Sequence, residues 1–187
     1  MTSNVPFPVM FVAGETGSWQ IENIEPVVGD GLDFAPRLVV ADGNKHPATS
    51  GAWSLIGTSS NGRYVRRSEA DDLASVQEGL GRPEATCAAL IPIRKSAAWW
   101  DLAQDERRSI MEEQSHHIGI GMEYLPAISR KLYHSRDLGE PFDFLTWFEY
   151  RPEHIRHFEQ LLDRLRATVE WQYVEREVDV RLRRAEI

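Results

Sequence analysis

The order of predicted strands and helices after residue 85 constrains the fold of this chain more than any other feature. The expected elements are a strand over 85–95, a helix from about 104 to 122, strands over 127–136 and 142–150, a helix from 152 to about 168 and a strand over 170–182. This β-α-β-β-α-β order is the ferredoxin-like arrangement. We therefore predict an α+β fold, with a ferredoxin-like domain over residues 85–187.

The first 84 residues have a different pattern, in which short β-type runs are separated by Gly, Pro, Asn and Asp clusters. These runs lie at 8–13, 17–24, 38–41 and 52–58. The single helix expected here begins after Ser68, with Asp71 completing a weak capping box, and ends near Gly79. We interpret residues 1–84 as a truncated, degenerate half that packs on the second half to complete a barrel.

Composition excludes several classes of protein. The 187 residues include 21 basic and 29 acidic side chains, a net charge of -8, which argues against nucleic-acid binding. Cys87 is the one cysteine, so a disulfide framework and a thiolate zinc site are excluded. No apolar run approaches the roughly 20 residues of a membrane span. We expect a cytoplasmic protein with no membrane partner.

His117 is the first of three polar anomalies. In a continuous helix it borders an apolar stripe, because it lies seven residues after Ile110. Gly119 and Gly121 follow it, and each glycine inside a helix costs about 1 kcal/mol relative to alanine. Such glycines indicate that something bulky lies against the backbone. A hydrogen-bonded core histidine explains the pattern equally well, and His116 is expected to be exposed.

Arg130 is the second anomaly, because it shares a strand face with Ile128 and Leu132. A cation in an apolar environment needs an anion. That anion is either an internal carboxylate or a bound ligand, and the pattern leaves both open.

The third anomaly is a pair of charges that the strand pattern places at buried positions. Glu170 shares a strand face with Val174, and Lys95 extends the face of Ile93. In this topology both residues can approach the helix that carries His117. A carboxylate there would orient the imidazole and raise its basicity, as it does for metal-bound histidines.

Three long blocks resemble the chlorite dismutase family, and in particular its compact, dimeric branch. They are LGRPEATCAALIPIRKSAAWW at 80–100, ERRSIMEEQSHHIGIGMEYLPAISRKLYHSRDLGEPFDFLTWFEY at 106–150 and LRATVEWQYVERE at 165–177. The resemblance implies a ferredoxin-like α+β barrel, haem b as cofactor and a homodimer. It also implies the conversion of chlorite to chloride and dioxygen through a transient hypochlorite.

The resemblance also gives roles to particular residues. His117 matches the proximal ligand of the haem iron, and Glu170 and Lys95 match the network that orients this ligand. Arg130 matches the distal arginine.

Four further residues match positions around the haem. Gln77 matches a glutamine near the distal arginine, Trp99 and Trp100 match aromatics beside the haem, and Tyr64 is placed near its propionates.

Two alternatives remain at this stage. Coproheme decarboxylases share the fold and the proximal histidine, but they generally carry a neutral residue at the position of Arg130. A haem-binding or haem-sensing protein without turnover would share all of these features.

Overall fold

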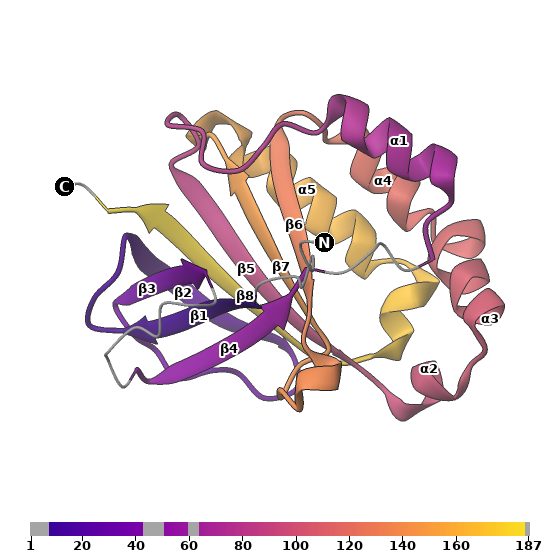
Figure 1. Ribbon diagram of the computed structural model, residues 1–187, viewed down its shortest axis with the longest axis horizontal. Helices are drawn as coiled ribbons and strands as arrows, with labels where there is room; N and C mark the ends of the chain where they lie inside the picture. The colour runs from indigo at the N-terminus through magenta and orange to yellow at the C-terminus, as the bar shows by residue number, and fades with distance from the viewer. Residues whose placement is uncertain (1–7, 43–50, 60–63, 186–187) are drawn as a thin grey trace, which may run out of the picture.

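The chain forms a closed antiparallel barrel with helices against one side (Figure 1). The computed structural model describes residues 8–42, 51–59 and 64–185. The strands are β1 Pro8–Gly14, β2 Trp19–Val28, β3 Arg37–Asp42, β4 Trp53–Thr58, β5 Cys87–Lys95, β6 Ile128–His134, β7 Phe144–Tyr150 and β8 Val174–Arg184. The α-helices are α1 Arg67–Val76, α2 Ala97–Asp101, α3 Gln104–Arg108, α4 His117–Glu123 and α5 Ile155–Arg166. The predicted α+β class is confirmed.

The strand order around the barrel is β1-β3-β2-β8-β5-β7-β6-β4. Within the second half, the neighbours run β8-β5-β7-β6, which is the ferredoxin-like order of fourth, first, third and second strand. The first half runs β4-β1-β3-β2, which is the same order. The two halves of the barrel therefore share one strand order.

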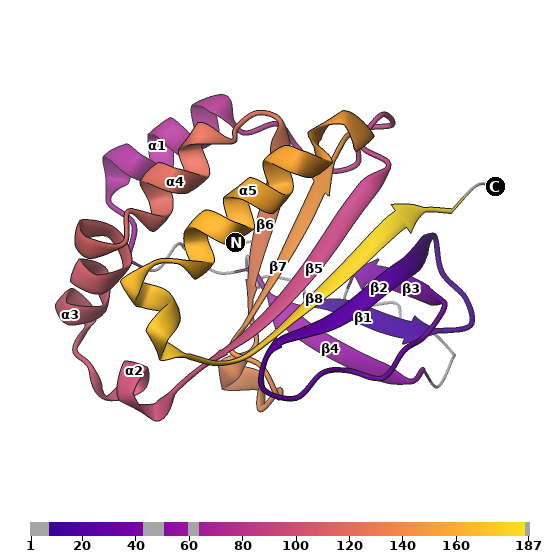
Figure 2. The ribbon, with the colours of Figure 1, turned by 180° about the vertical axis from the view of Figure 1, so that it is seen from behind.

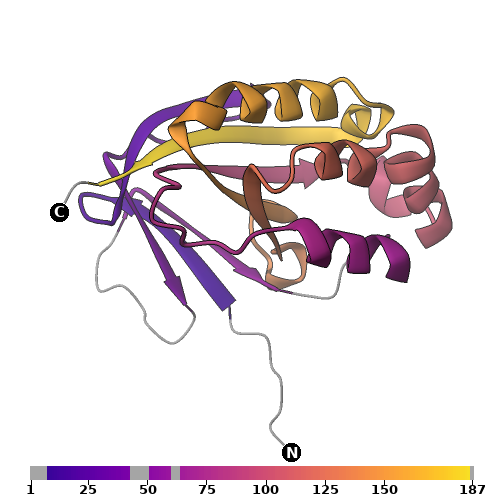
Figure 3. The ribbon, with the colours of Figure 1, turned by 90° about the horizontal axis from the view of Figure 1, so that it is seen from above.

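The helices cover only the second half of the barrel. α5 crosses the outer face of the sheet β8-β5-β7-β6, with α4 and α1 beyond it (Figure 2). Seen from above, the α-helices lie on the side of the second-half sheet (Figure 3). Among the described residues, no α-helix covers β1–β4.

The core of the barrel joins both halves. The ring of Phe11 lies 5.7 Å from the rings of Tyr133 and of Trp147, and Trp19 meets Trp147 edge-on at 5.3 Å. A second core cluster lies between the outer face of the sheet and α5. β5 contributes to both clusters, so Leu90 and Ile91 are both buried. A strand buried on both faces carries a continuous apolar run rather than an alternating one.

Strands β4 and β6 have the fewest paired positions of any neighbouring strands that the structure describes in the barrel. Thr58 and His134 form the one paired position that the structure records between these strands. The backbone N–H of Ile56 donates instead to the carboxylate of Glu140, at 3.0 Å. The seam between β4 and β6 is thus held in part by a side chain.

The prediction of one continuous helix to residue 122 was wrong. After α3 the chain forms a π-helical segment, Ser109–Gln114, and then breaks at His116, whose φ of 53° is left-handed. α4 begins anew at His117. The carboxylate of Glu112 accepts the N–H groups of Ile118 and Gly119 at 2.7 and 3.3 Å. This side chain satisfies the amides that a helix N-terminus leaves free, so the break is stable.

Three other boundaries also differ from expectation. The connection after β5 contains a short helix, α2. α1 begins at Arg67, and its capping carboxylate is that of Glu69 rather than Asp71, because Glu69 accepts the N–H of Arg66 at 2.7 Å. The last strand begins at Val174 and not at Glu170, which lies in the 3₁₀ turn Val169–Tyr173.

Candidate active site

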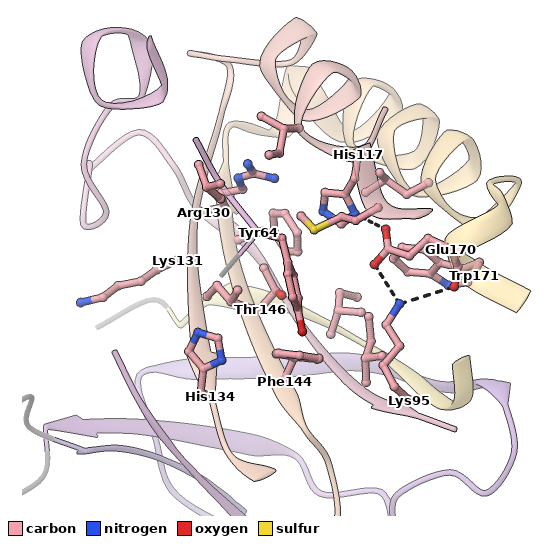
Figure 4. Close-up of a pocket in the computed structure, with 18 of the residues that line it drawn as sticks. Tyr64, Lys95, His117, Arg130, Lys131, His134, Phe144, Thr146, Glu170 and Trp171 are labelled. Atoms are coloured by element: carbon pink, nitrogen blue, oxygen red, sulfur yellow. Dashed lines mark hydrogen bonds and ion pairs between the residues drawn. The ribbon is translucent and has the colours of Figure 1, made fainter. Parts of the chain in front are cut away.

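A cavity of about 420 Å³ lies between the helices and the outer face of the sheet (Figure 4). Its walls are mainly apolar, with side chains that include Ile91, Ile93, Met111, Ile118, Phe144, Phe148, Leu162, Leu165 and Trp171. The polar residues among those that line the cavity include Lys95, His117, Arg130, Lys131, His134 and Glu170. Lys95 is paired with Glu170, and the side chain of Lys131 points away from the cavity, whereas Arg130 points into it (Figure 4).

His117, Glu170 and Lys95 form a continuous hydrogen-bonded chain. The Nδ1 atom of His117 lies 2.7 Å from Oε2 of Glu170, and Nζ of Lys95 donates to Oε1 at 2.8 Å (Figure 4). The N–H of Glu170 donates to Oγ of Ser115 at 2.9 Å. With both carboxylate oxygens engaged, this side chain fixes the orientation of the imidazole and leaves Nε2 available to a ligand.

The charge of Glu170 is stabilised by its neighbours. Burial of the carboxyl opposes ionisation, but the charges and hydrogen bonds of His117 and Lys95 outweigh it and lower the pKa of Glu170 to about 2. The structure thus brings these three residues together, as the sequence indicated. The reason given for Glu170 was wrong, because a 3₁₀ turn and not a strand face places it there.

Arg130 projects from β6 into the same cavity (Figure 4). Within the described residues its guanidinium has no carboxylate partner. Burial lowers the pKa of Arg130, yet an arginine stays charged in proteins. An unpaired, desolvated guanidinium is a site for an anionic ligand.

The two glycines of α4 have different explanations. A Cβ at Gly121 would lie 2.8 Å from Nη1 of Arg130, so this glycine makes room for the guanidinium. A Cβ at Gly119 would meet nothing closer than 3.6 Å. The prediction of bulk against the backbone is confirmed at Gly121 and wrong at Gly119.

The structure places Gln77 and Tyr64 in the wall of the cavity. The side-chain amide of Gln77 donates to the backbone carbonyl of Arg130 at 2.9 Å, which ties the end of α1 to β6. The hydroxyl of Tyr64 accepts from Nη1 of Arg107 at 3.2 Å.

The two adjacent tryptophans differ in position. Trp99 is 1% exposed and lines the cavity. Trp100 is not among the described lining residues, and its ring instead stacks on Phe144 while its N–H donates to Asp143 at 3.1 Å. Trp100 therefore supports a wall that Phe144 forms.

Three residues with structural roles at the site escaped the sequence analysis. Trp171 stacks on the His117 ring, and Glu112 caps α4. Arg107 donates to the backbone carbonyls of Trp99 and Trp100 in α2. Trp171 directly follows Glu170, and that adjacency was the one signal that could have found it.

Comparison with known proteins identifies the family. The chlorite dismutase family model matches residues 43–184, which is most of the chain. This chain belongs to the chlorite dismutase family. No helix in the described parts of the chain is long and apolar enough to cross a membrane.

Individual chlorite dismutases agree with this assignment. A dimeric chlorite dismutase structure from Nitrobacter winogradskyi is 59% identical, with a TM-score of 0.89, over 95% of this chain and 99% of that one. A chlorite dismutase from Candidatus Nitrospira defluvii in complex with imidazole is 28% identical, with a TM-score of 0.57, over 78% of this chain and 56% of that one. Chlorite dismutase from Ideonella dechloratans is 32% identical over 98 residues, which are 51% of this chain and about a third (33%) of that protein.

Proposed function

We propose that this protein binds haem b through His117 and converts chlorite to chloride and dioxygen. The observation that carries the proposal is the guanidinium of Arg130, which lacks a carboxylate partner among the described residues and shares an apolar cavity with His117. A structural salt bridge would have explained this arginine without a ligand, and none is found in the described part of the chain.

The residues present fit a haem. No three His, Cys, Asp or Glu side chains converge to hold a metal ion in the parts of the chain that the structure describes. A metal held by His117 must therefore bring its own further ligands, as the iron of a macrocycle does. The buried Nε1 of Trp99 has no described hydrogen-bond partner, which leaves a donor for a group in the cavity.

Glu170 and Lys95 would act on His117, the residue that ligates the iron, whereas Arg130 would act on the substrate. When bound, haem supplies the redox chemistry. Glu170 holds the Nδ1 proton of His117, which makes Nε2 the ligating atom and raises its basicity. Lys95 balances the charge of Glu170.

Arg130 would act on the substrate. Its guanidinium would attract chlorite, a small anion. When chlorite has lost one oxygen, the guanidinium would hold the resulting hypochlorite by charge-assisted hydrogen bonds until the two oxygens join, which gives dioxygen and chloride. The apolar walls strengthen this hold because they lower the local dielectric constant. Gln77 keeps the backbone at Arg130 in position.

We also propose that the protein is a homodimer, since the structure from Nitrobacter winogradskyi is of dimeric chlorite dismutases. Light scattering that reports a monomer would contradict this. The division at residue 84 and the cytoplasmic location stay predictions.

Oxygen evolution tests the proposed reaction. Holoprotein supplied with chlorite should evolve dioxygen at an electrode. Arg130→Ala should retain haem but lose catalytic efficiency on the order of 10²-fold, and a hypochlorite scavenger should protect its haem from bleaching more than that of the parent. Arg130→Lys should be intermediate, because it keeps the charge and loses the planar fork.

Arg164→Ala is the matched control, because this arginine lies on α5 outside the cavity lining and forms a partly exposed ion pair with Glu123 of α4. It should evolve oxygen at the parent rate. A holoprotein that evolves no oxygen would refute the proposal, and equal bleaching in the parent and Arg130→Ala would remove Arg130 from its assigned role.

A further inference from the structure

The imidazole of His117 has a second neighbour besides Glu170. The indole of Trp171 stacks on it, with ring centroids 6.2 Å apart and planes 25° apart. Trp171 and Glu170 belong to the same 3₁₀ turn, so this turn supplies both a hydrogen bond to the edge of the imidazole and a contact to its face. The ammonium of Lys95 also lies over the indole, 5.4 Å from its centroid.

A hydrogen bond from its N–H group fixes the position of the Trp171 indole. Its Nε1 donates to Oε2 of Glu177 at 2.7 Å. Glu177 is fully buried on β8, and its other oxygen accepts from Nε of Arg166 on α5 at 2.9 Å. Arg166 also donates to Asp179 at 3.1 Å, and Arg181 binds Asp179 in turn.

Stability alone is a weak reason for this arrangement. Burying an ion pair costs desolvation free energy, and well-packed apolar residues often replace such pairs without loss. What Glu177 provides that an apolar residue cannot is an acceptor aimed at the indole N–H. That hydrogen bond selects one orientation of the ring, and this orientation brings the face of Trp171 to His117.

We propose that Arg166, Glu177 and Trp171 form a second positioning chain for His117, which acts on the face of the imidazole while Lys95 and Glu170 act on its edge. The proposal rests on haem binding through His117. The edge hydrogen bond sets the direction of Nδ1 but leaves the ring free to tilt about that bond. The face contact restricts this tilt, and with it the spread of iron–histidine geometries.

Two conservative variants test the chain. Trp171→Phe keeps an aromatic face and removes the N–H. Glu177→Gln keeps the shape but replaces one oxygen by an NH2 group, so a single oxygen cannot accept from both Arg166 and Trp171 as the carboxylate does. In the ferrous haem-loaded protein, both should shift or broaden the iron–histidine stretching band. Both should also speed haem transfer to an acceptor apoprotein, on the order of 10-fold. Because the residues act in series, the double variant should resemble the single ones rather than their sum.

Asp179→Asn is the matched control. It disturbs the same buried arginine but does not touch Trp171. Its melting temperature should fall about as much as that of Glu177→Gln, while its stretching band and haem transfer stay those of the parent.

Three results would overturn the proposal. An unchanged stretching band in Trp171→Phe would do so, as would an effect of Asp179→Asn equal to that of Glu177→Gln. A parent protein that fails to bind haem through His117 would refute the proposed function first, and that result is seen before any variant is compared.

Discussion

The two halves of the barrel have the same strand order but different coverings. In the first half, four residues join β1 to β2. In the second half, the corresponding connection from β5 to β6 spans residues 96–127 and contains α2, α3 and α4. Strand pairing therefore survives without the helices, because closure of the barrel gives the inner faces of both sheets a shared core. The helices are needed only where a cavity must be enclosed.

This difference separates stability from chemistry. Both halves contribute large aromatic residues to the interior, as the contacts of Phe11 and Trp19 with Trp147 show. Except for Ser59, Tyr64, Val65, Leu73 and Gln77, the residues that line the cavity come from the second half. Substitutions in the two halves should therefore give different phenotypes.

The largest effect is expected at His117. His117→Ala should lose the protein ligand to iron, so haem should be retained loosely and without activity. His116→Ala is the control, because the left-handed backbone at His116 separates the two side chains and leaves His116 exposed. Absorption spectra of both variants after haem titration check this, and a spectrum of His116→Ala that resembles His117→Ala would refute the assignment.

The next effect concerns the first half, whose strands β1–β4 no helix of the described residues covers. Phe11→Ala should lower the free energy of unfolding by about 3–5 kcal/mol, because the ring is fully buried. Phe34→Ala, at a side chain that is 66% exposed, should change it by less than about 0.5 kcal/mol. Urea unfolding measures both.

The folded fraction of Phe11→Ala should keep the parent iron–histidine stretching band. A changed band would show that the first half also shapes the site, and the comparison between the halves would then fail.

Acid should weaken the second half through Glu170. Its pKa is lowered from 4.5 to about 2 in the folded haem-free protein, so its ionised form stabilises the fold above pH 4.5. This contribution is lost as the pH falls from 4.5 through about 2. The free energy of unfolding of the parent should fall over that window more steeply than that of Glu170→Gln. Parallel curves would show that the carboxylate is not stabilised as described.

The smallest change in stability is expected at the two glycines of α4. Gly119→Ala has room for a methyl group and should stabilise the helix by up to about 1 kcal/mol. Gly121→Ala must displace the guanidinium of Arg130 and should therefore release more hypochlorite during turnover. Thermal melting and scavenger trapping compare the pair, and equal leakage from both would contradict the steric role of Gly121.

Elements that depend on neighbouring residues were predicted from the sequence, whereas features that depend on contacts between separate elements were not. Strands with local apolar runs, such as β1 and β5, were predicted to within a few residues. The break at His116 was not, because it depends on the Glu112 carboxylate reaching amides of α4. Polar residues at apolar positions identified His117 and Arg130, whereas Trp171 was missed because an aromatic residue near apolar positions looks like ordinary core.

The thin seam between β4 and β6 has a consequence for behaviour at high concentration. Strand edges with free amides can recruit a strand from another molecule and begin aggregation. Glu140 occupies the amide of Ile56 with a carboxylate, so an incoming strand would find that donor already taken and would meet a negative charge. The side chain of Glu140 thus protects the weakly paired edges of β4 and β6 from pairing with a strand of another molecule.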